Sequence, residues 1–130
     1  GVRRQRQMCI RDRFLGGSGV KDRPTLNMCS PGTEVDINGS QATKHCIPSN
    51  SKTYHNEDWI SVEFIVYSDS IVHHVIDRDT VMTYSNIKIG GEYLSDNFKD
   101  QIGEPLKEGY ISLQSEGHPI EFKNIRVKEL

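Results

Sequence analysis

The residues from Ile60 to Tyr67 alternate in a way that admits one kind of element. Apolar side chains fall at every second position, and the positions between them are mixed in character. A period of two places successive side chains on opposite faces of a β-strand, whereas an amphipathic helix needs apolar residues three or four positions apart. The chain has no helical period of useful length. We therefore expect a sheet protein in which this stretch buries Ile60, Val62, Phe64 and Val66.

Turn signals separate further short runs of the same kind. EVDI and SQATKHC are joined by Asn38-Gly39, which is the strongest short hairpin signal available. SIVHHVID and TVMTYS are separated by Asp77-Arg78-Asp79, which also indicates an antiparallel hairpin. Residues 14–28 begin with glycines around a serine and read as loop. The polar segment DNFKDQIG favours one helical turn.

The C-terminal stretch GYISLQSEGHPIEFKNIRVKEL continues the strand pattern. Glu116-Gly117 predicts a turn between two strands. The apolar positions then change from even to odd numbers across Lys123-Asn124, so a β-bulge there would keep Ile125 and Val127 in the core. About seven short strands with turns between them predict an antiparallel sandwich. A chain of 130 residues suits one such domain.

The first thirteen residues differ from the rest in charge. Read back into codons, RRQRQMCIRDR resembles a transposase-based sequencing adapter, so we expect 1–13 to be an artefactual or disordered leader and 14–130 to be a partial domain. Five of the 16 basic residues and one of the 18 acidic residues lie in this leader. The remainder holds 11 basic and 17 acidic residues, a net charge of −6, which argues against a nucleic-acid partner.

Cys29 and Cys46 remain once Cys9 is set aside with the leader. Around the Asn38-Gly39 turn they are two residues out of register, about 7–8 Å apart, which exceeds disulfide spacing unless a bulge at Pro31-Gly32 closes the gap. Two alternatives stay open for these cysteines, which are a disulfide and two separate buried thiols. Zinc is not expected, because Cys29, His45 and Cys46 lack paired ligand spacing.

The C-terminal motif resembles the 3-keto-disaccharide hydrolase domain family. That family shows Gly-aromatic-Ile-x-Leu-Gln, a short turn, and apolar-x-Phe-Arg-Asn-Ile. The corresponding residues here are Gly109, Tyr110, Ile111, Leu113, Gln114, Gly117, His118, Ile120, Phe122, Asn124 and Ile125, with Lys123 in place of the arginine. CSPGTEVDINGSQATKHC, SKTYH and the Trp59-to-Glu63 segment are also similar to one branch of the family.

The resemblance implies a concanavalin-like jelly roll whose concave face binds carbohydrate. It also implies cleavage of glycosides oxidised at C3 of glucose. The family's earlier strands, with a segment resembling Tyr-Glu-x-Gln, are not seen here, so we expect an N-terminally truncated domain. Asp77-Arg78-Asp79 also replaces the usual Asn-Gly hairpin. Whether this domain is itself an enzyme stays open, and the alternative is a non-catalytic carbohydrate-binding module on the same fold.

Candidate site residues follow from the strand faces. His118 and Glu121 are the catalytic candidates, because an imidazole and a carboxylate near one another can serve as base and acid. Alternation places His73 and His74 on opposite faces, so at most one can reach a groove, and a core or cross-strand position is the plainer alternative for each. A surface hairpin is the plainer alternative for the catalytic pair, as a solvated face is for the strand residues. The substrate-binding candidates are Trp59, Glu63, His74 and Gln114.

The remaining expectations concern partners and location. The sequence requires no cofactor, although a divalent metal is compatible with the candidate acids and histidines. No apolar run approaches the roughly 20 residues that span a bilayer. A carbohydrate partner and a periplasmic or extracellular location fit the acidic body and the two cysteines.

Overall fold

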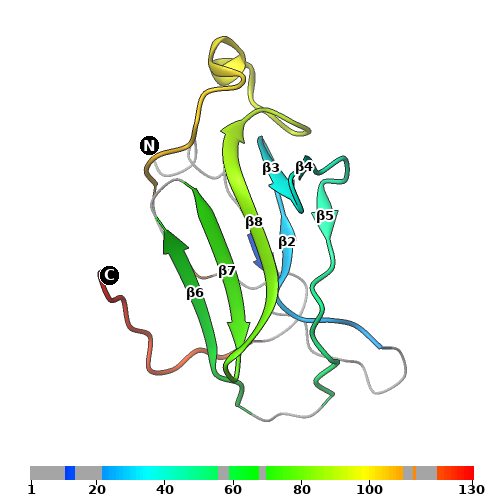
Figure 1. Ribbon diagram of the computed structural model, residues 1–130, viewed down its shortest axis with the longest axis vertical. Coiled ribbons are helices and arrows are strands. Elements are labelled where there is room, and N and C mark those ends of the chain that lie inside the picture. The colour runs from blue at the N-terminus through cyan, green and yellow to red at the C-terminus, as the bar shows by residue number, and fades with distance from the viewer. Residues whose placement is uncertain (1–10, 14–21, 56–58, 68–69, 110–112, 114–119) are drawn as a thin grey trace.

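The computed structural model describes residues 11–13, 22–55, 59–67, 70–109, 113 and 120–130, and there the strands form two antiparallel sheets (Figure 1). The smaller sheet has the order β1 (Arg11–Arg13), β2 (Asn27–Cys29) and β5 (Cys46–Ile47). The larger sheet has the order β4 (Ser40–Gln41), β3 (Thr33–Ile37), β8 (Asp79–Ile89), β7 (Ile71–Ile76) and β6 (Val62–Tyr67). A 3-10 helix, η2 (Asp96–Gln101), follows β8, where one helical turn was expected.

The two sheets pack face to face around a shared core. Met28 of β2 lies fully buried in one cluster with four residues of the larger sheet, which are Val35, Val72, Met82 and Tyr84. A second cluster joins Leu26, just before β2, to Ile76 and Val81. Apolar side chains from both layers therefore exclude water between them. The predicted all-β antiparallel sandwich is confirmed, while its jelly-roll connectivity stays a prediction.

A β-bulge in β8 keeps the core continuous along a long strand. His74 faces Met82, but the next pair on β7 is Val75 with Thr80, so Val81 is an extra residue on β8. Both Val81 and Met82 are buried. Regular alternation would have sent one of these neighbours outward, and the bulge lets both point into the sandwich.

The disulfide between Cys29 and Cys46 ties β2 to β5. These residues face each other with a Cα–Cα distance of 4.1 Å. In the neighbouring hairpin, Ile37 faces Ser40 across the Asn38-Gly39 turn. If that register continued along the chain, the two cysteines would lie two residues out of line, so the β2–β5 pairing is displaced by two residues from the hairpin register. The turn at Pro31-Gly32 takes up the two extra residues, where the sequence required a bulge for a disulfide to form.

The C-terminal residues that the structure describes depart from the predicted strands. Residues 120–130 form no strand, and Ile125 and Val127 are 64% and 80% exposed, so their predicted burial behind a bulge is wrong. The backbone does change direction where the pattern changes, because Asn124 adopts φ 54°. Alternation determines which side chains share a face, but it cannot supply the neighbouring strand that backbone groups need.

The leader departs from expectation at one point. Arg11, Asp12 and Arg13 form β1 and pair with Cys29, Met28 and Asn27. A ladder of backbone hydrogen bonds makes no demand on side-chain type, so the open edge of β2 accepts this segment. Met8 and Ile10, whose burial would decide whether the leader has a place in the core, lie outside the described residues.

The β7–β8 turn is strained, and this generates a stability prediction. Asp77 and Arg78 adopt φ 46° and 77°, a left-handed conformation that costs a non-glycine residue roughly 1 kcal/mol. We expect Arg78→Gly to raise the free energy of unfolding by about 0.5–1 kcal/mol, measured by urea denaturation.

The Asn38-Gly39 turn supplies the matched control. Gly39 has φ 81°, and beyond its two chain neighbours no atom of the described residues lies within 4 Å of the position that a Cβ would take there. Gly39→Arg therefore adds backbone strain without a clash. This change should lower stability by about the amount that Arg78→Gly gains. A stabilising Gly39→Arg, or a destabilising Arg78→Gly, would contradict the strain argument.

Candidate functional site

The outer face of the larger sheet gathers polar and aromatic side chains. Ile65 faces His73 on β7, and His73 faces Thr83 on β8, so these three residues share one side of the sheet. Glu63 and Tyr67 lie two positions either side of Ile65 and therefore share that side too. We call Glu63, Tyr67, His73 and Thr83 the outer-face cluster.

Contacts within the outer-face cluster hold the imidazole in place. His73 Nδ1 lies 2.8 Å from Thr83 Oγ1. The ring of Tyr67 meets the His73 ring edge to face at a centroid distance of 5.9 Å, and Tyr67 is 51% exposed. Glu63 is exposed and lies diagonally from His73, roughly 7–8 Å away by sheet geometry. An aromatic ring beside an imidazole, a hydroxyl and a carboxylate is a surface suited to sugar hydroxyls.

His74 points the other way and belongs to the core. It is fully buried, with Nδ1 2.9 Å from the carbonyl of Leu26 and Nε2 3.2 Å from the hydroxyl of Tyr84. Because a carbonyl only accepts, Nδ1 carries the proton and Nε2 accepts from Tyr84. The rings of Phe64 and Tyr84 pack edge-on against it at 5.0 and 5.2 Å. The substrate-binding role expected for His74 is thus corrected, since burial keeps it from a sugar.

His73 is the residue that the sequence could not rank above its neighbour. The signal that identifies it is the pairing of Tyr67 with Ile71. Paired residues share a face, so an odd-numbered residue on β6 shares its face with odd-numbered residues on β7. Glu63 and Tyr67 are odd-numbered, so the histidine that shares their face is His73. Alternation within one strand gives two faces, and only the register between strands connects them.

Trp59 and Glu121 lie apart from any regular strand. Trp59 is 54% exposed and precedes β6, and the ammonium of Lys123 stands 4.1 Å from the centroid of its ring. This cation–π contact links the C-terminal segment to the residues just before β6 and occupies one face of the indole. Glu121 is exposed. Gln114 and His118 lie outside the described residues, so the geometry of the catalytic pair is not described.

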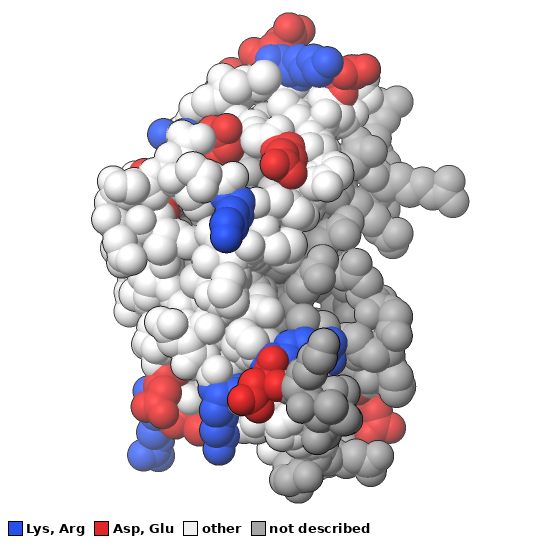
Figure 2. Space-filling model, turned by 90° about the vertical axis from the view of Figure 1, so that its right-hand side faces the viewer, with Lys and Arg blue, Asp and Glu red and all other residues white. Residues whose placement is uncertain are grey.

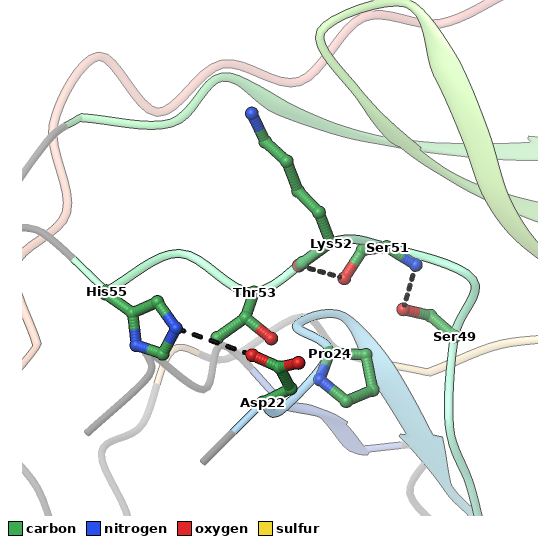
Figure 3. Close-up of a pocket in the computed structure, with 7 residues that line it drawn as sticks. All are labelled: Asp22, Pro24, Ser49, Ser51, Lys52, Thr53 and His55. Carbon is green, nitrogen blue, oxygen red and sulfur yellow. Dashed lines mark hydrogen bonds and ion pairs between the residues drawn. The ribbon is translucent and has the colours of Figure 1, made fainter. Parts of the chain in front are cut away.

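A second polar region is a cavity of about 500 Å³ among loops (Figure 3). Its walls come from the segment before β2 and from the segment after β5, and its lining residues are Asp22, Pro24, Ser49, Ser51, Lys52, Thr53 and His55. His55 points towards Asp22, with Nε2 3.7 Å from Oδ1. The carboxylate is almost fully exposed, so this contact contributes little to stability.

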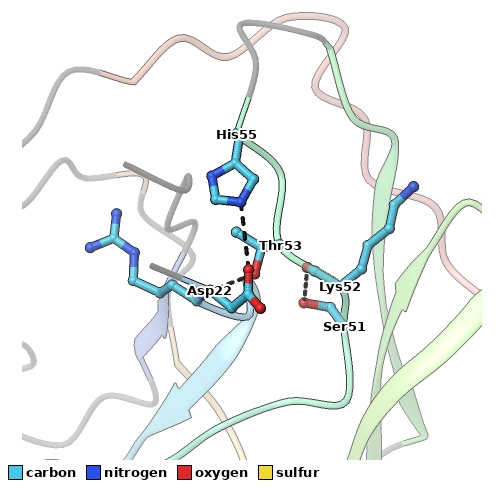
Figure 4. A network of polar contacts seen from close by, with 6 residues as sticks. Asp22, Ser51, Lys52, Thr53 and His55 are labelled. Carbon is cyan, nitrogen blue, oxygen red and sulfur yellow. Dashed lines mark hydrogen bonds and ion pairs between the residues drawn. The ribbon is translucent and has the colours of Figure 1, made fainter. Parts of the chain in front are cut away.

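The hydroxyl groups of this cavity are already engaged with the backbone. Ser49 Oγ and Ser51 Oγ both donate to the carbonyl of Thr25. Thr53 Oγ1 accepts from the amide of Arg23 at 2.7 Å, and Figure 4 shows Thr53 beside Asp22 and His55 in this network. These bonds join the loop before β2 to the loop after β5. We therefore interpret the residues that line the cavity as a structural link between the two loops.

Tyr54, next to this cavity, is also a structural residue. Its ring packs against the core cluster of Leu26, Ile76 and Val81, and the Lys52 ammonium stands 5.0 Å from the ring centroid. Burial raises the pKa of Tyr54, and the carboxylates of Asp77 and Asp79 raise it further. The phenol is accordingly neutral at physiological pH and is no base there.

Charged side chains of both signs are interspersed on the face drawn in Figure 2, which gathers them towards its upper and lower ends. Asp96 and Lys99 of η2 form an ion pair at 2.7 Å. The hydrogen bond from Lys99 lowers the pKa of Asp96. The described residues contain no helix of the length and apolar character needed to cross a bilayer.

A comparison with protein families decides the relationship of the chain. A sequence model of the 3-keto-alpha-glucoside-1,2-lyase-like domain matches residues 13–128. The chain belongs to this family. The resemblance seen in the C-terminal motif is thereby confirmed, and a carbohydrate-active domain is the class to which the chain is assigned. No curated protein and no solved structure was found to match the chain.

The opposite placements of His73 and His74 yield a prediction on stability. We expect His74→Ala to lower the free energy of unfolding by about 2–4 kcal/mol, because it removes buried ring contacts and leaves the Tyr84 hydroxyl without its imidazole acceptor. His73→Ala should cost no more than about 1 kcal/mol. Urea denaturation of both variants checks this. Equal losses would show that the two faces are not distinguished as described.

Proposed function

We propose that this domain binds an oxidised glucoside and cleaves 3-keto-glycosides or 3-keto-disaccharides. The outer-face cluster supports this most directly, because it presents Tyr67, His73 and Thr83 together on an exposed sheet face in a chain of the 3-keto-alpha-glucoside-1,2-lyase-like family. Trp59, close to β6, adds a second exposed ring. Rings stack on the apolar faces of sugars, while hydroxyl, imidazole and carboxylate groups bind their hydroxyls.

The proposed reaction follows from the chemistry of a 3-keto sugar. The ketone acidifies the hydrogen at C2, so a base removes that proton and an enolate forms. The enolate expels the C1 substituent, whose oxygen takes a proton from an acid, and water then adds across the double bond. The reaction needs a base, an acid and a donor to the enolate oxygen. We assign the acid and base roles to His118 and Glu121, with Glu63 and Gln114 as sugar-binding groups.

A non-catalytic carbohydrate-binding module is the second candidate. Tyr67 and Trp59 are each about half exposed, as rings that stack on sugars must be. The Cys29–Cys46 disulfide supports a periplasmic or extracellular location for either candidate.

Turnover of a defined substrate tests the enzymatic proposal. The chain is incubated with 3-keto-trehalose, and released glucose is followed by NMR. We expect His118→Ala to lower kcat/KM by about 100-fold or more, since general acid–base catalysis contributes that much. His55→Ala, in the loop cavity, is the matched histidine control and should leave turnover unchanged. Turnover that survives His118→Ala would dismiss the assigned role.

Binding is measured separately, through the fluorescence of Trp59, the single tryptophan of the chain. We expect Tyr67→Ala to weaken sugar binding about tenfold, because one stacking ring contributes roughly 1 kcal/mol or more. Saturable binding without product would favour the module. A chain that shows neither binding nor product would contradict both candidates.

A further inference from the structure

A cluster of three potential metal ligands lies away from the outer-face cluster. Cys29, His45 and Cys46 bring two sulfurs and one imidazole nitrogen within 4.8 Å of one another. Their spacing along the chain gave no sign of a metal site. The strand register creates the cluster, because Cys29 faces Cys46 across the β2–β5 ladder and His45 is the neighbour of Cys46. In the structure the two sulfurs are joined to each other.

The imidazole of His45 has a buried nitrogen to which no described residue offers a hydrogen bond. This atom, Nδ1, is shielded from solvent. The ring is held at its edge by Tyr93, at a centroid distance of 4.9 Å, and the backbone carbonyl of His45 accepts from the amide of Ser30 at 2.9 Å. A buried polar atom without a partner is uncommon and calls for an explanation. A ligand that binds Nδ1 when the sulfurs are free would provide one.

We propose that reduction of the Cys29–Cys46 disulfide opens a binding site for a thiophilic d¹⁰ cation such as Zn²⁺, held by Cys29 Sγ, Cys46 Sγ and His45 Nδ1. Zinc binds thiolate at about 2.3 Å and imidazole at about 2.0–2.1 Å, which places tetrahedral ligands about 3.5–3.8 Å apart. The three ligand atoms lie within 4.8 Å of one another, and breaking the S–S bond lets the two sulfurs separate to this spacing. Three protein ligands leave the fourth position for water.

The redox step balances with a phosphine as the reductant. Phosphorus attacks the half-buried Cys46 sulfur, the S–S bond breaks, and Cys29 sulfur leaves with the bonding electrons. Water then attacks phosphorus and the P–S bond breaks, which yields a phosphine oxide and two thiols that hold the protons of water. Zn²⁺ displaces these two protons when it binds. The disulfide form has no thiolate to offer, so occupancy depends on reduction.

Zinc binding to the full chain tests the proposal, with Cys9→Ser as background so that only Cys29 and Cys46 supply thiols. Equilibrium dialysis is run on oxidised protein and on protein reduced with a phosphine. We expect one Zn²⁺ per reduced chain and none per oxidised chain. In the reduced form His45→Ala should weaken affinity at least tenfold, whereas His55→Ala, an exposed loop histidine, should not change it.

Circular dichroism distinguishes zinc binding by the folded protein from zinc binding by an unfolded chain. Reduced protein with Zn²⁺ should show the sheet spectrum of the oxidised protein, and if reduction alone loosens the fold, Zn²⁺ should restore it. Cobalt in place of zinc should give a thiolate charge-transfer band only after reduction. Equal zinc binding by oxidised and reduced protein, an unchanged affinity in His45→Ala, or a zinc complex without sheet structure would each overturn the proposal.

Discussion

The hydrogen bond from His74 on β7 to the carbonyl of Leu26, just before β2, joins the larger sheet to the segment that leads into the smaller one. Apolar packing alone is non-directional and would tolerate sliding of one sheet over the other. Both nitrogens of the buried His74 ring have partners, because Nδ1 meets the carbonyl of Leu26, just before β2, and Nε2 meets the hydroxyl of Tyr84 on β8. The bond therefore fixes which residue of β7 points inward, and the neighbouring clusters of Met28 and Ile76 are arranged around it.

The exposure of the candidate site depends on the same inward orientation of His74. With His74 buried, alternation turns His73 outward to meet Thr83 and Tyr67. A slip of one residue would bury the outer-face cluster and expose the core face, so the two faces are specified together. The bulge at Val81 preserves this arrangement further along β8 without disturbing the pairing of His73. Core packing and surface chemistry are thus two results of one register.

The sequence predicted the parts of the fold that rest on local chemistry. The Asn38-Gly39 hairpin, the β7–β8 hairpin and the helical turn at Asp96 follow from turn residues and alternation. It could not rank His73 against His74, because that choice belongs to pairing between strands. It also failed at Phe64 and Val66, which are 38% and 52% exposed because β6 is an edge strand. Ile125 and Val127 are exposed as well, although their alternation suggested burial, because the described segment has no neighbouring strand. The resemblance of the C-terminal motif correctly indicated the family, although that motif lies partly outside the described residues.

The cross-link between Cys29 and Cys46 also bears on how quickly the chain reaches this state. It encloses the whole β3–β4 hairpin, with the Asn38-Gly39 turn near the middle of the closed loop. In an oxidised unfolded chain the ends of this loop are already together, so the search for the β2–β5 contact is over before folding starts. Sequence-distant pairing slows folding, and the bond shortens the effective distance along the chain. In the oxidised chain the β2–β5 contact is therefore present before folding begins, whereas in the reduced chain it has to form during folding.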